Sequence, residues 1–335
     1  MRRLLLISAL VVALAFLLVG TAAADNGPHT GLYTTTTDAC AGCHRAHRGK
    51  AEYLLKETTQ LALCFSCHGS AATGADTNVE DGVYLERASG GAYGDVGEGL
   101  RGGGFVNALM DPDMDQTTAS ASVTSKHSVE ETGTIWGNED FGTGPGKTGV
   151  TLRCGSCHNP HGFADQDIYR VLRPIPEDSD ATSEVVVPDE EPKKYNVEYW
   201  SGDPAILVGY RDPMADEWMF SDRDQRFAEW CAQCHWRYLA NDFSGTGDPI
   251  FNYRHATHVQ ISPANANILV CQTCHVAHGT SATMAAYSGS VEWPDDTPGG
   301  GAVDSRLLHV NNRGVCIQCH EAPGEDRGCL SCHGP

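Results

Sequence analysis

All fourteen cysteines of this chain stand in one pattern, Cys-x-x-Cys-His. Two thiols at this spacing can add to the two vinyl groups of one haem, and the histidine that follows is then held beneath the iron as its proximal ligand. The pattern therefore predicts covalently attached haem. The thiols that would attach it are Cys40, Cys43, Cys64, Cys67, Cys154, Cys157, Cys231, Cys234, Cys271, Cys274, Cys316, Cys319, Cys329 and Cys332.

Disulfide bonds and zinc sites are two other uses of paired cysteines, and each explains less of the pattern than haem does. A disulfide framework explains the even number of cysteines, but neither the uniform spacing nor the histidine after each pair. Zinc sites would join two Cys-x-x-Cys pairs per metal, and seven pairs is an odd number. We therefore expect seven haem c groups, each with its iron. Their proximal ligands would be His44, His68, His158, His235, His275, His320 and His333.

Eight histidines remain as distal ligands for seven irons. They are His29, His47, His127, His161, His255, His258, His278 and His309. The count is sufficient to place a second histidine on every iron, with one histidine to spare.

The second histidine of the stretch CQTCHVAHGT has a geometric constraint. His275 and His278 are three residues apart, so on a helical turn their Cβ atoms are only about 5–6 Å apart. Axial ligands approach one iron from opposite faces, each through a bond of about 2 Å. His278 therefore cannot complete the iron that His275 binds, and must reach a second haem packed against the first. The same holds for His47 and His161.

A threefold repeat organises the motifs. The stretches PHTGLYTTTTDACAGCHRAH, SKHSVEETG…CGSCHNPHG and RHATHVQ…CQTCHVAHGT each join an upstream histidine to a Cys-x-x-Cys-His-x-x-His, and each is followed by a plain Cys-x-x-Cys-His. Such a repeat stacks small units that cannot bury a core alone. We expect a first unit over 25–125 with a glycine-rich linker, a second over 126–250 with an acidic insertion, and a third over 251–335 with the seventh motif appended.

The repeat assigns the distal ligands by unit. It gives His29 and His47 to the first pair of haems, and His127 and His161 to the second pair. One of His255 and His258, with His278, goes to the third pair. His309 is left for the seventh haem. The other member of the His255 and His258 pair is then spare, or ligates a haem in a neighbouring subunit.

The N-terminal segment predicts export. A basic start precedes the apolar run Leu4–Val19, and Ala22–Ala24 then forms a small-residue cleavage pattern. The run is short for a membrane span. We expect a signal peptide over 1–24 and no stable membrane span after its cleavage, with an uncleaved anchor as the alternative. The mature protein would be extracellular or on the cell surface, or alternatively periplasmic.

The charge of the chain restricts its partners. Asp and Glu number 43 against 23 Lys and Arg, for a formal net charge of −20. Such a chain repels the phosphates of nucleic acid, so nucleic acid is excluded as an expected partner. It attracts basic redox proteins or metal cations, and identical chains repel one another at low salt. We expect other redox proteins or extracellular electron acceptors as partners.

The repeat, and SKHSVEETG…CGSCHNPHG above all, resembles the doubled-CXXCH group of multihaem c-type cytochromes. The resemblance covers most of the mature chain. It implies bis-histidine haems in closely stacked pairs, wound by chain with little regular secondary structure. Some similar proteins polymerise into extracellular cytochrome filaments, or nanowires, with a distal histidine donated across the subunit boundary. A homopolymer is therefore a further expectation.

The expected fold class is a multihaem cytochrome c, mostly irregular coil with short α-helices around stacked haems. Between His161 and Cys231 we expect a minor β-element, because Glu184–Val187, Tyr195–Trp200 and Ala205–Tyr210 have β-like composition among prolines. A helix near 224–239 would carry the fourth haem.

The expected function is electron transport without a catalytic residue. A heptahaem carrier or conduit for extracellular electron transfer would hold every iron six-coordinate, and electrons would hop along its stacked haems. The alternative is a multihaem oxidoreductase, which needs one iron with an open position. Eight spare histidines for seven irons favour the carrier, so we expect no enzymatic activity. A filament subunit is a special case of the carrier.

Overall fold

The computed structural model describes residue 29 and residues 39–71, 75–85, 96–113, 115, 117–129, 132–136, 146–163, 168–189, 210–211, 218–219, 222–238, 271–283 and 306–311. These ranges hold the first five Cys-x-x-Cys-His motifs, which we number by their order in the chain. The expected signal peptide, the sixth and seventh motifs, and both His255 and His258 lie outside them.

Short helices carry the cysteine pairs. One helical turn is all that a motif needs to bring its two sulfurs to one side, and three of the five helices concerned are four residues long. The helices are η1 (Ala39–Gly42), α2 (Gln60–His68), α3 (Cys154–Cys157), α4 (Asp222–Ala232) and α5 (Cys271–Cys274). Three further turns are η2 (Glu52–Leu54), η3 (Tyr169–Val171) and η6 (Trp236–Tyr238).

The two longer helices begin and end for local reasons. Thr59 caps α2, because its side-chain oxygen accepts a hydrogen bond from Ala62 N at 3.1 Å. The helix that we expect near 224–239 is observed as α4, which ends at Ala232. Its last turn tightens, since both Cys234 N and His235 N donate to the carbonyl of Cys231. His235 therefore leaves the helix axis, and η6 follows.

The strands form small antiparallel pairs. The pairs are β1 (Thr77–Asn78) with β2 (Val83–Tyr84), β3 (Asn107–Met110) with β4 (Ala119–Ser122), β5 (Ser125–Lys126) with β10 (Gly279–Thr280), β6 (Thr132–Trp136) with β7 (Gly146–Thr151), and β8 (Tyr210–Arg211) with β9 (Trp218–Met219). Of these, β5 and β10 join segments far apart in the sequence. β5 ends just before His127 and β10 begins just after His278, so this pairing brings two predicted distal ligands to one place.

The insertion differs in detail from the expected β-element. Glu184–Val187 forms no strand, and Val187 is instead fully buried in the core. The run Ala205–Tyr210 contributes only its last residue, as the start of β8. Tyr195–Trp200 lies outside the described residues. The longer hairpin, β6 with β7, precedes the third motif and was not predicted, because its strands are rich in glycine and threonine rather than in large apolar residues.

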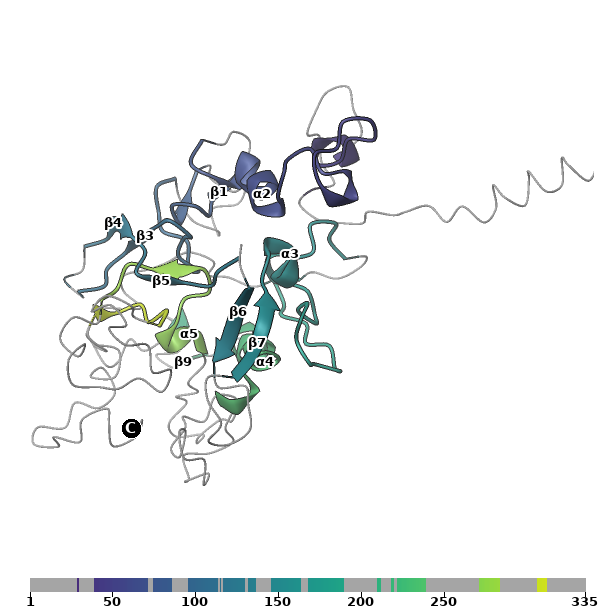
Figure 1. Ribbon diagram of the computed structural model, residues 1–335. Coiled ribbons are helices and arrows are strands. Elements are labelled where there is room, and N and C mark those ends of the chain that lie inside the picture. The colour runs from purple at the N-terminus through teal and green to yellow at the C-terminus, as the bar shows by residue number, and fades with distance from the viewer. Residues whose placement is uncertain are drawn as a thin grey trace, which may run out of the picture.

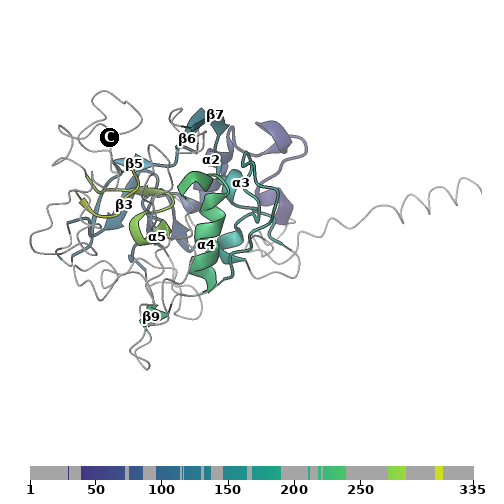
Figure 2. The same cartoon turned by 90° about the horizontal axis from the view of Figure 1, so that it is seen from below.

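One hydrophobic cluster of the described core lies within the second unit. Ile168, Tyr169, Leu172, Val187 and Phe227 are buried together, with Trp230 packed against them. This cluster holds the start of the insertion against α4. Figures 1 and 2 show α3 near α2 and α5 near α4, and both pairs are in contact, so the helices of consecutive motifs pack together.

No helix in the described ranges is long and apolar enough to cross a membrane. The stacked-haem architecture itself stays a prediction.

Candidate haem-binding sites

Each described motif is a single tight turn. In the four motifs whose histidine lies beyond the end of its helix, the backbone N–H of the histidine donates to the carbonyl of the first cysteine. The N···O distances are 2.8 Å for His44 to Cys40, 2.9 Å for His158 to Cys154, 3.0 Å for His235 to Cys231 and 2.9 Å for His275 to Cys271. This is the local geometry that a haem bound by both thiols and by the histidine requires.

A second segment, which we call the clamp, closes the first motif of every unit. The clamps are residues 53–56, 170–173 and 306–309. In each, the carbonyl of the first clamp residue accepts a hydrogen bond from Nδ1 of the proximal histidine. The distances are 2.8 Å from His44 to Tyr53, 2.8 Å from His158 to Arg170 and 3.0 Å from His275 to Arg306.

These hydrogen bonds fix the tautomer of the proximal imidazoles. A carbonyl can only accept, so Nδ1 carries the proton and the lone pair is left on Nε2. Metal-bound histidines are oriented in the same way by a carbonyl or carboxylate on the second ring nitrogen. The clamps therefore prepare three imidazoles to bind iron through Nε2.

The same backbone register repeats in the three clamps. In the second unit, Asn159 N donates to Val171 O at 2.8 Å and Arg173 N donates to Cys157 O at 2.7 Å. The corresponding distances are 2.8 Å (Arg45 to Leu54) and 2.9 Å (Lys56 to Cys43) in the first unit, and 2.9 Å (Val276 to Leu307) and 3.1 Å (His309 to Cys274) in the third. Lys56, Arg173 and His309 are thus structurally equivalent.

Each clamp begins with two residues in the left-handed conformation. Their φ angles are 58° and 58° at Tyr53 and Leu54, 48° and 51° at Arg170 and Val171, and 54° and 63° at Arg306 and Leu307. None is glycine, so each costs roughly 1–2 kcal/mol relative to an ordinary backbone conformation. The strain turns the carbonyl of the first residue toward the imidazole, which is why it recurs where a histidine must be held.

The clamps were not found from the sequence. They follow their histidines at separations of 9, 12 and 31 residues, so no fixed spacing marks them. The signal that they share is a leucine after the left-handed pair, at Leu55, Leu172 and Leu308, which pairs in a short bridge with the proximal histidine. A single leucine is too common to be recognised as a motif.

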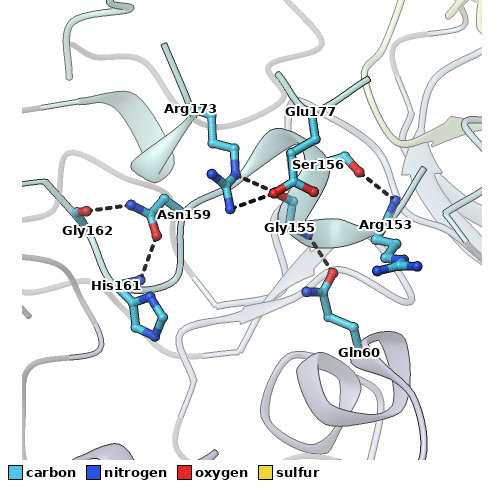
Figure 3. Close-up of polar contacts among 9 residues, drawn as sticks. All are labelled: Gln60, Arg153, Gly155, Ser156, Asn159, His161, Gly162, Arg173 and Glu177. Atoms are coloured by element: carbon cyan, nitrogen blue, oxygen red, sulfur yellow. Dashed lines mark hydrogen bonds and ion pairs between the residues drawn. The ribbon is translucent and has the colours of Figure 1, made fainter. Parts of the chain in front are cut away.

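Side chains also anchor the third motif (Figure 3). Gly155 N donates to Gln60 Oε1 at 2.8 Å, which links α3 to the start of α2. From the clamp, Arg173 donates through Nε to Gly155 O and pairs with Glu177 at 3.0 Å. On the other side, Asn159 Oδ1 accepts from His161 N at 3.2 Å. The motif is therefore fixed both to the preceding motif and to the turn that carries His161.

Thiols of consecutive motifs lie against one another. A hydrogen bond between Cys64 and Cys154 raises the pKa of Cys64 and lowers that of Cys154. Cys231 and Cys271 form the same kind of pair, which raises the pKa of Cys231 and lowers that of Cys271. These thiols stand where the thioether sulfurs of attached haems would lie. The second motif therefore adjoins the third, and the fourth adjoins the fifth.

The predicted distal histidines are oriented by carbonyls as well. Nδ1 of His29 donates to Pro160 O at 2.9 Å, and Nδ1 of His127 donates to Ala277 O at 2.6 Å. Pro160 and Ala277 directly precede His161 and His278, the histidines that stand three residues after the histidine of a motif. Each upstream histidine is therefore held by the first motif of the following unit.

Four pairs of imidazoles lie at nearly one separation. The ring centroids are 6.2 Å apart for His44 and His161, 6.0 Å for His68 and His29, 6.3 Å for His158 and His278, and 6.2 Å for His235 and His127. Each pair joins the proximal histidine of one of the first four motifs to a predicted distal histidine. The separation lies toward the long end of the range for two rings in direct contact, about 4.5–7 Å.

An iron atom between the rings would account for this separation. A metal–imidazole bond of about 2 Å on each side, with roughly 1.2 Å from each nitrogen to its ring centre, would separate two axial imidazoles by about 6.4 Å. In six of these eight histidines Nδ1 lies within hydrogen-bond distance of a backbone carbonyl, which for His68 is that of Thr77, so Nε2 is left for the metal. The residues present therefore fit bis-histidine haem at the first four motifs.

The pairing differs from the order that the repeat predicts. The repeat gives His161 to the second pair of haems, but its ring faces His44 of the first unit. It gives His278 to the third pair, but that ring faces His158 of the second. His161 and His278, which stand three residues after a motif histidine, each face the proximal histidine of the first motif of the preceding unit. His29 and His127 lie in the units that the repeat predicts.

Burial of the site favours the neutral form of these imidazoles. Removal from water is the main cause that lowers the pKa of His68, His127 and His158. It also lowers the pKa of His278 to about 3, with a smaller contribution from the positive charge of a protonated His158. A neutral imidazole is the form that binds iron, so the histidines are ready to act as ligands at neutral pH.

The remaining predicted ligands are placed as follows. His47 is exposed, on the loop after the first motif. His309 is fully buried and lies beside the fifth motif through its backbone bond to Cys274, while the seventh motif that it was predicted to serve lies outside the described residues. His255, His258, His320 and His333 also lie outside them.

Residues 34–73, which hold the first two motifs, match the family model described as the doubled CXXCH motif. This match supports the resemblance of the chain to the doubled-CXXCH multihaem cytochromes. No curated protein and no solved structure matches the chain. In this family the Cys-x-x-Cys-His motif indicates covalently bound haem c, and the associated function is electron transfer.

Proposed function

We propose that this doubled-CXXCH cytochrome is a secreted heptahaem protein that moves electrons by hopping along stacked bis-histidine haems. The four imidazole pairs at 6.0–6.3 Å carry the proposal, because two protein ligands on an iron leave no position for a substrate. The protein would make and break no substrate bond. Each hop would oxidise one iron by one electron and reduce the next.

The order of hops is supported by the contacts between motifs. Cys64 adjoins Cys154 and Cys231 adjoins Cys271, while α2 packs on α3 and α4 on α5. These contacts support a second haem beside the third and a fourth beside the fifth. We propose a path that follows the order of the motifs along the chain, with redox proteins or extracellular acceptors at its ends.

The first test is quantitative EPR of the fully oxidised protein, together with haem and iron per chain. We expect seven haems, all low-spin. A high-spin signal near one haem per chain that changes on addition of nitrite, hydroxylamine or cyanide would show an open iron. That result would replace the carrier with the alternative, an oxidoreductase.

A filament is the second proposal, and the displaced pairing of units supports it. Within the chain, each of the first two units is completed by the unit that follows it. The first motif of the following unit supplies a distal histidine to the first haem of the preceding unit. It also supplies a carbonyl that accepts a hydrogen bond from the upstream histidine of the preceding unit. His161 and Pro160 serve the first unit in this way, and His278 and Ala277 serve the second. The equivalent residues in the first unit are His47 and Ala46, and both are exposed.

We therefore propose that the first unit of one copy docks on the third unit of another. His47 would then bind the iron held by His275 of the neighbouring copy. The exposed side chains beside it support this: Tyr53 is 72% and Leu54 is 52% exposed, whereas the equivalent Arg170 and Val171 are half-buried against the rest of the chain. A head-to-tail contact of this kind does not close and builds a fibre.

Negative-stain microscopy and EPR of His47→Ala test the filament. We expect fibres from the wild type, and dispersed particles with about one high-spin haem per chain from the variant. Arg48→Ala, on the same exposed loop, is the matched control and should leave the fibres intact. Dispersed wild-type particles across salt and pH would contradict the polymer and leave a discrete carrier.

A further inference from the structure

Phe105 stacks on the ring of one proposed distal ligand. Its ring centroid is 4.7 Å from that of His278, and the two ring planes differ by 28°. Phe105 is 7% exposed, and its backbone N donates to Val79 O at 3.0 Å, so the phenyl ring is held in place. It also lies 6.4 Å from the ring of Phe65, which belongs to the second motif. A residue of the first unit therefore packs on a histidine of the third.

The hydrogen bond from His278 Nδ1 is too long to fix the plane of its ring. The distance to Gly103 O is 3.4 Å, near the limit for a hydrogen bond. The corresponding distances to a carbonyl are 2.6 Å for His127 and 2.9 Å for His29. Because a histidine ring turns easily about its χ2 torsion, a weak bond leaves its plane free. Phe105 supplies the restraint, since turning the imidazole would drive its edge into the phenyl face.

The four imidazole pairs differ in the angle between their ring planes. The angles are 19° for His44 and His161, 80° for His68 and His29, 59° for His158 and His278, and 44° for His235 and His127. Two axial rings in parallel planes act on the same iron d orbital, whereas two in perpendicular planes act on one orbital each. The angle therefore changes the energy of the orbital that takes up the electron, so the arrangement of the axial ligands tunes the iron.

We propose that Phe105 fixes the plane of His278, and thereby the angle between the two axial ligands of the third haem. Phe105 is then a positioning residue, which acts on the iron only through the imidazole. Groups packed around a metal ligand orient it and tune its metal in this way. The inference rests on the axial pairing in the proposed function, because the angle affects an iron only if both rings bind it.

EPR of the fully oxidised, intact protein measures this angle, because the g-values of a low-spin haem depend on the relative orientation of its two axial rings. His278→Gly first identifies the third haem, whose low-spin signal should disappear. In Phe105→Leu we expect every haem to stay low-spin, with that one signal broadened and its largest g-value shifted, since the ring is no longer held at one angle. Phe105→Tyr keeps an aromatic face and should keep the wild-type g-value.

Phe227→Leu is the matched control. Phe227 is 8% exposed, against 7% for Phe105, and its ring makes a T-shaped contact with Tyr169 at 5.6 Å in the cluster of the second unit. Both leucine variants remove a buried aromatic ring, so denaturant unfolding should show similar losses of stability. Only Phe105→Leu should shift the signal of the third haem.

The outcomes separate this inference from the proposed function. A high-spin haem in the wild type would overturn the axial pairing itself. An all-low-spin wild type whose spectrum superimposes on that of Phe105→Leu, or an equal shift in Phe227→Leu, would overturn the inference alone. If Phe105→Leu attaches fewer haems, Phe105→Met decides, because methionine fills a similar space without a ring plane. It should shift the same signal, and an unshifted signal would overturn the inference.

Discussion

At the scale of the residue, the group that accepts the hydrogen bond from Nδ1 sets the tautomer and the orientation of a histidine ring. His44, His158 and His275 are proximal, and His29 and His127 are distal, yet all five donate Nδ1 to a backbone carbonyl. A carbonyl fixes both the tautomer and the direction of Nε2, and it does so without a titrating group. Ligand positions are therefore built by the backbone rather than by further side chains.

The first prediction tests the displaced pairing. His161→Gly should leave the iron bound by His44 without its distal ligand, because those two rings are 6.2 Å apart. EPR should then show about one high-spin haem per chain, and added imidazole should restore the low-spin signal by filling the position. Retention of seven low-spin haems, with no effect of imidazole or cyanide, would contradict the assignment.

The second prediction concerns acid. Removal from water lowers the pKa of His68, His127 and His158, and that of His278 to about 3, below the ordinary value of 6.5. The unfolded chain therefore binds more protons than the folded chain below pH 6.5. Stability from these histidines is complete above pH 6.5 and is lost as the pH falls toward 3.

A pH titration of the haem absorption spectrum measures this loss. We expect the low-spin spectrum to persist well below pH 6.5, with conversion to high-spin only in the acid range, since iron competes further with the proton. Conversion centred between pH 6 and 7 would show that the imidazoles titrate as solvated groups.

At the scale of the element, glycines let the third unit approach the first. Gly103 has φ 70°, and a Cβ placed there would lie far inside contact distance of Gly279 O. This approach carries two bonds to His278: its N donates to Gly102 O at 2.7 Å and its Nδ1 to Gly103 O at 3.4 Å. Phe105 stacks on the same ring with centroids 4.7 Å apart. The contact therefore positions His278, the proposed distal ligand of the third haem.

Gly103→Ala should accordingly push β10 away and release His278. We expect a loss of stability of several kcal/mol, above the 1–2 kcal/mol for the left-handed backbone alone, because backbone meets backbone. One haem should also become high-spin. Gly97→Ala is the matched control, since Gly97 has φ 85° with nothing within 4 Å of the added Cβ. Denaturant unfolding followed by haem absorbance compares the two, and equal losses would mean that the close approach is unimportant.

At the scale of the whole molecule, net charge opposes assembly. The chain carries a formal charge of −20, and the proposed head-to-tail contact would bring identical chains together. Charge repulsion acts over about 30 Å at 0.01 M salt but over about 8 Å at 0.15 M. The balance between the discrete protein and the filament should therefore depend on ionic strength.

We expect fibres to form at physiological salt and to shorten or dissociate near 0.01 M. Sedimentation velocity of one preparation in the two buffers measures this, with microscopy as the check on particle shape. His47→Ala, which lacks the proposed bridging ligand, should sediment as a single small species in both. Larger assemblies at low salt than at high salt would contradict an assembly that is opposed by repulsion between the net charges of the chains.

The sequence alone predicts which residues attach haem, because five consecutive residues in one turn would carry all three bonds. It also predicts that His47, His161 and His278 serve another iron than that of their own motif, since three residues cannot span two faces of a haem. Only the tertiary structure decided which proximal histidine His161 and His278 each face, and that carbonyls of three left-handed clamps hold the proximal rings. Those contacts depend on how units stack and on loops of unequal length, and no local pattern encodes either.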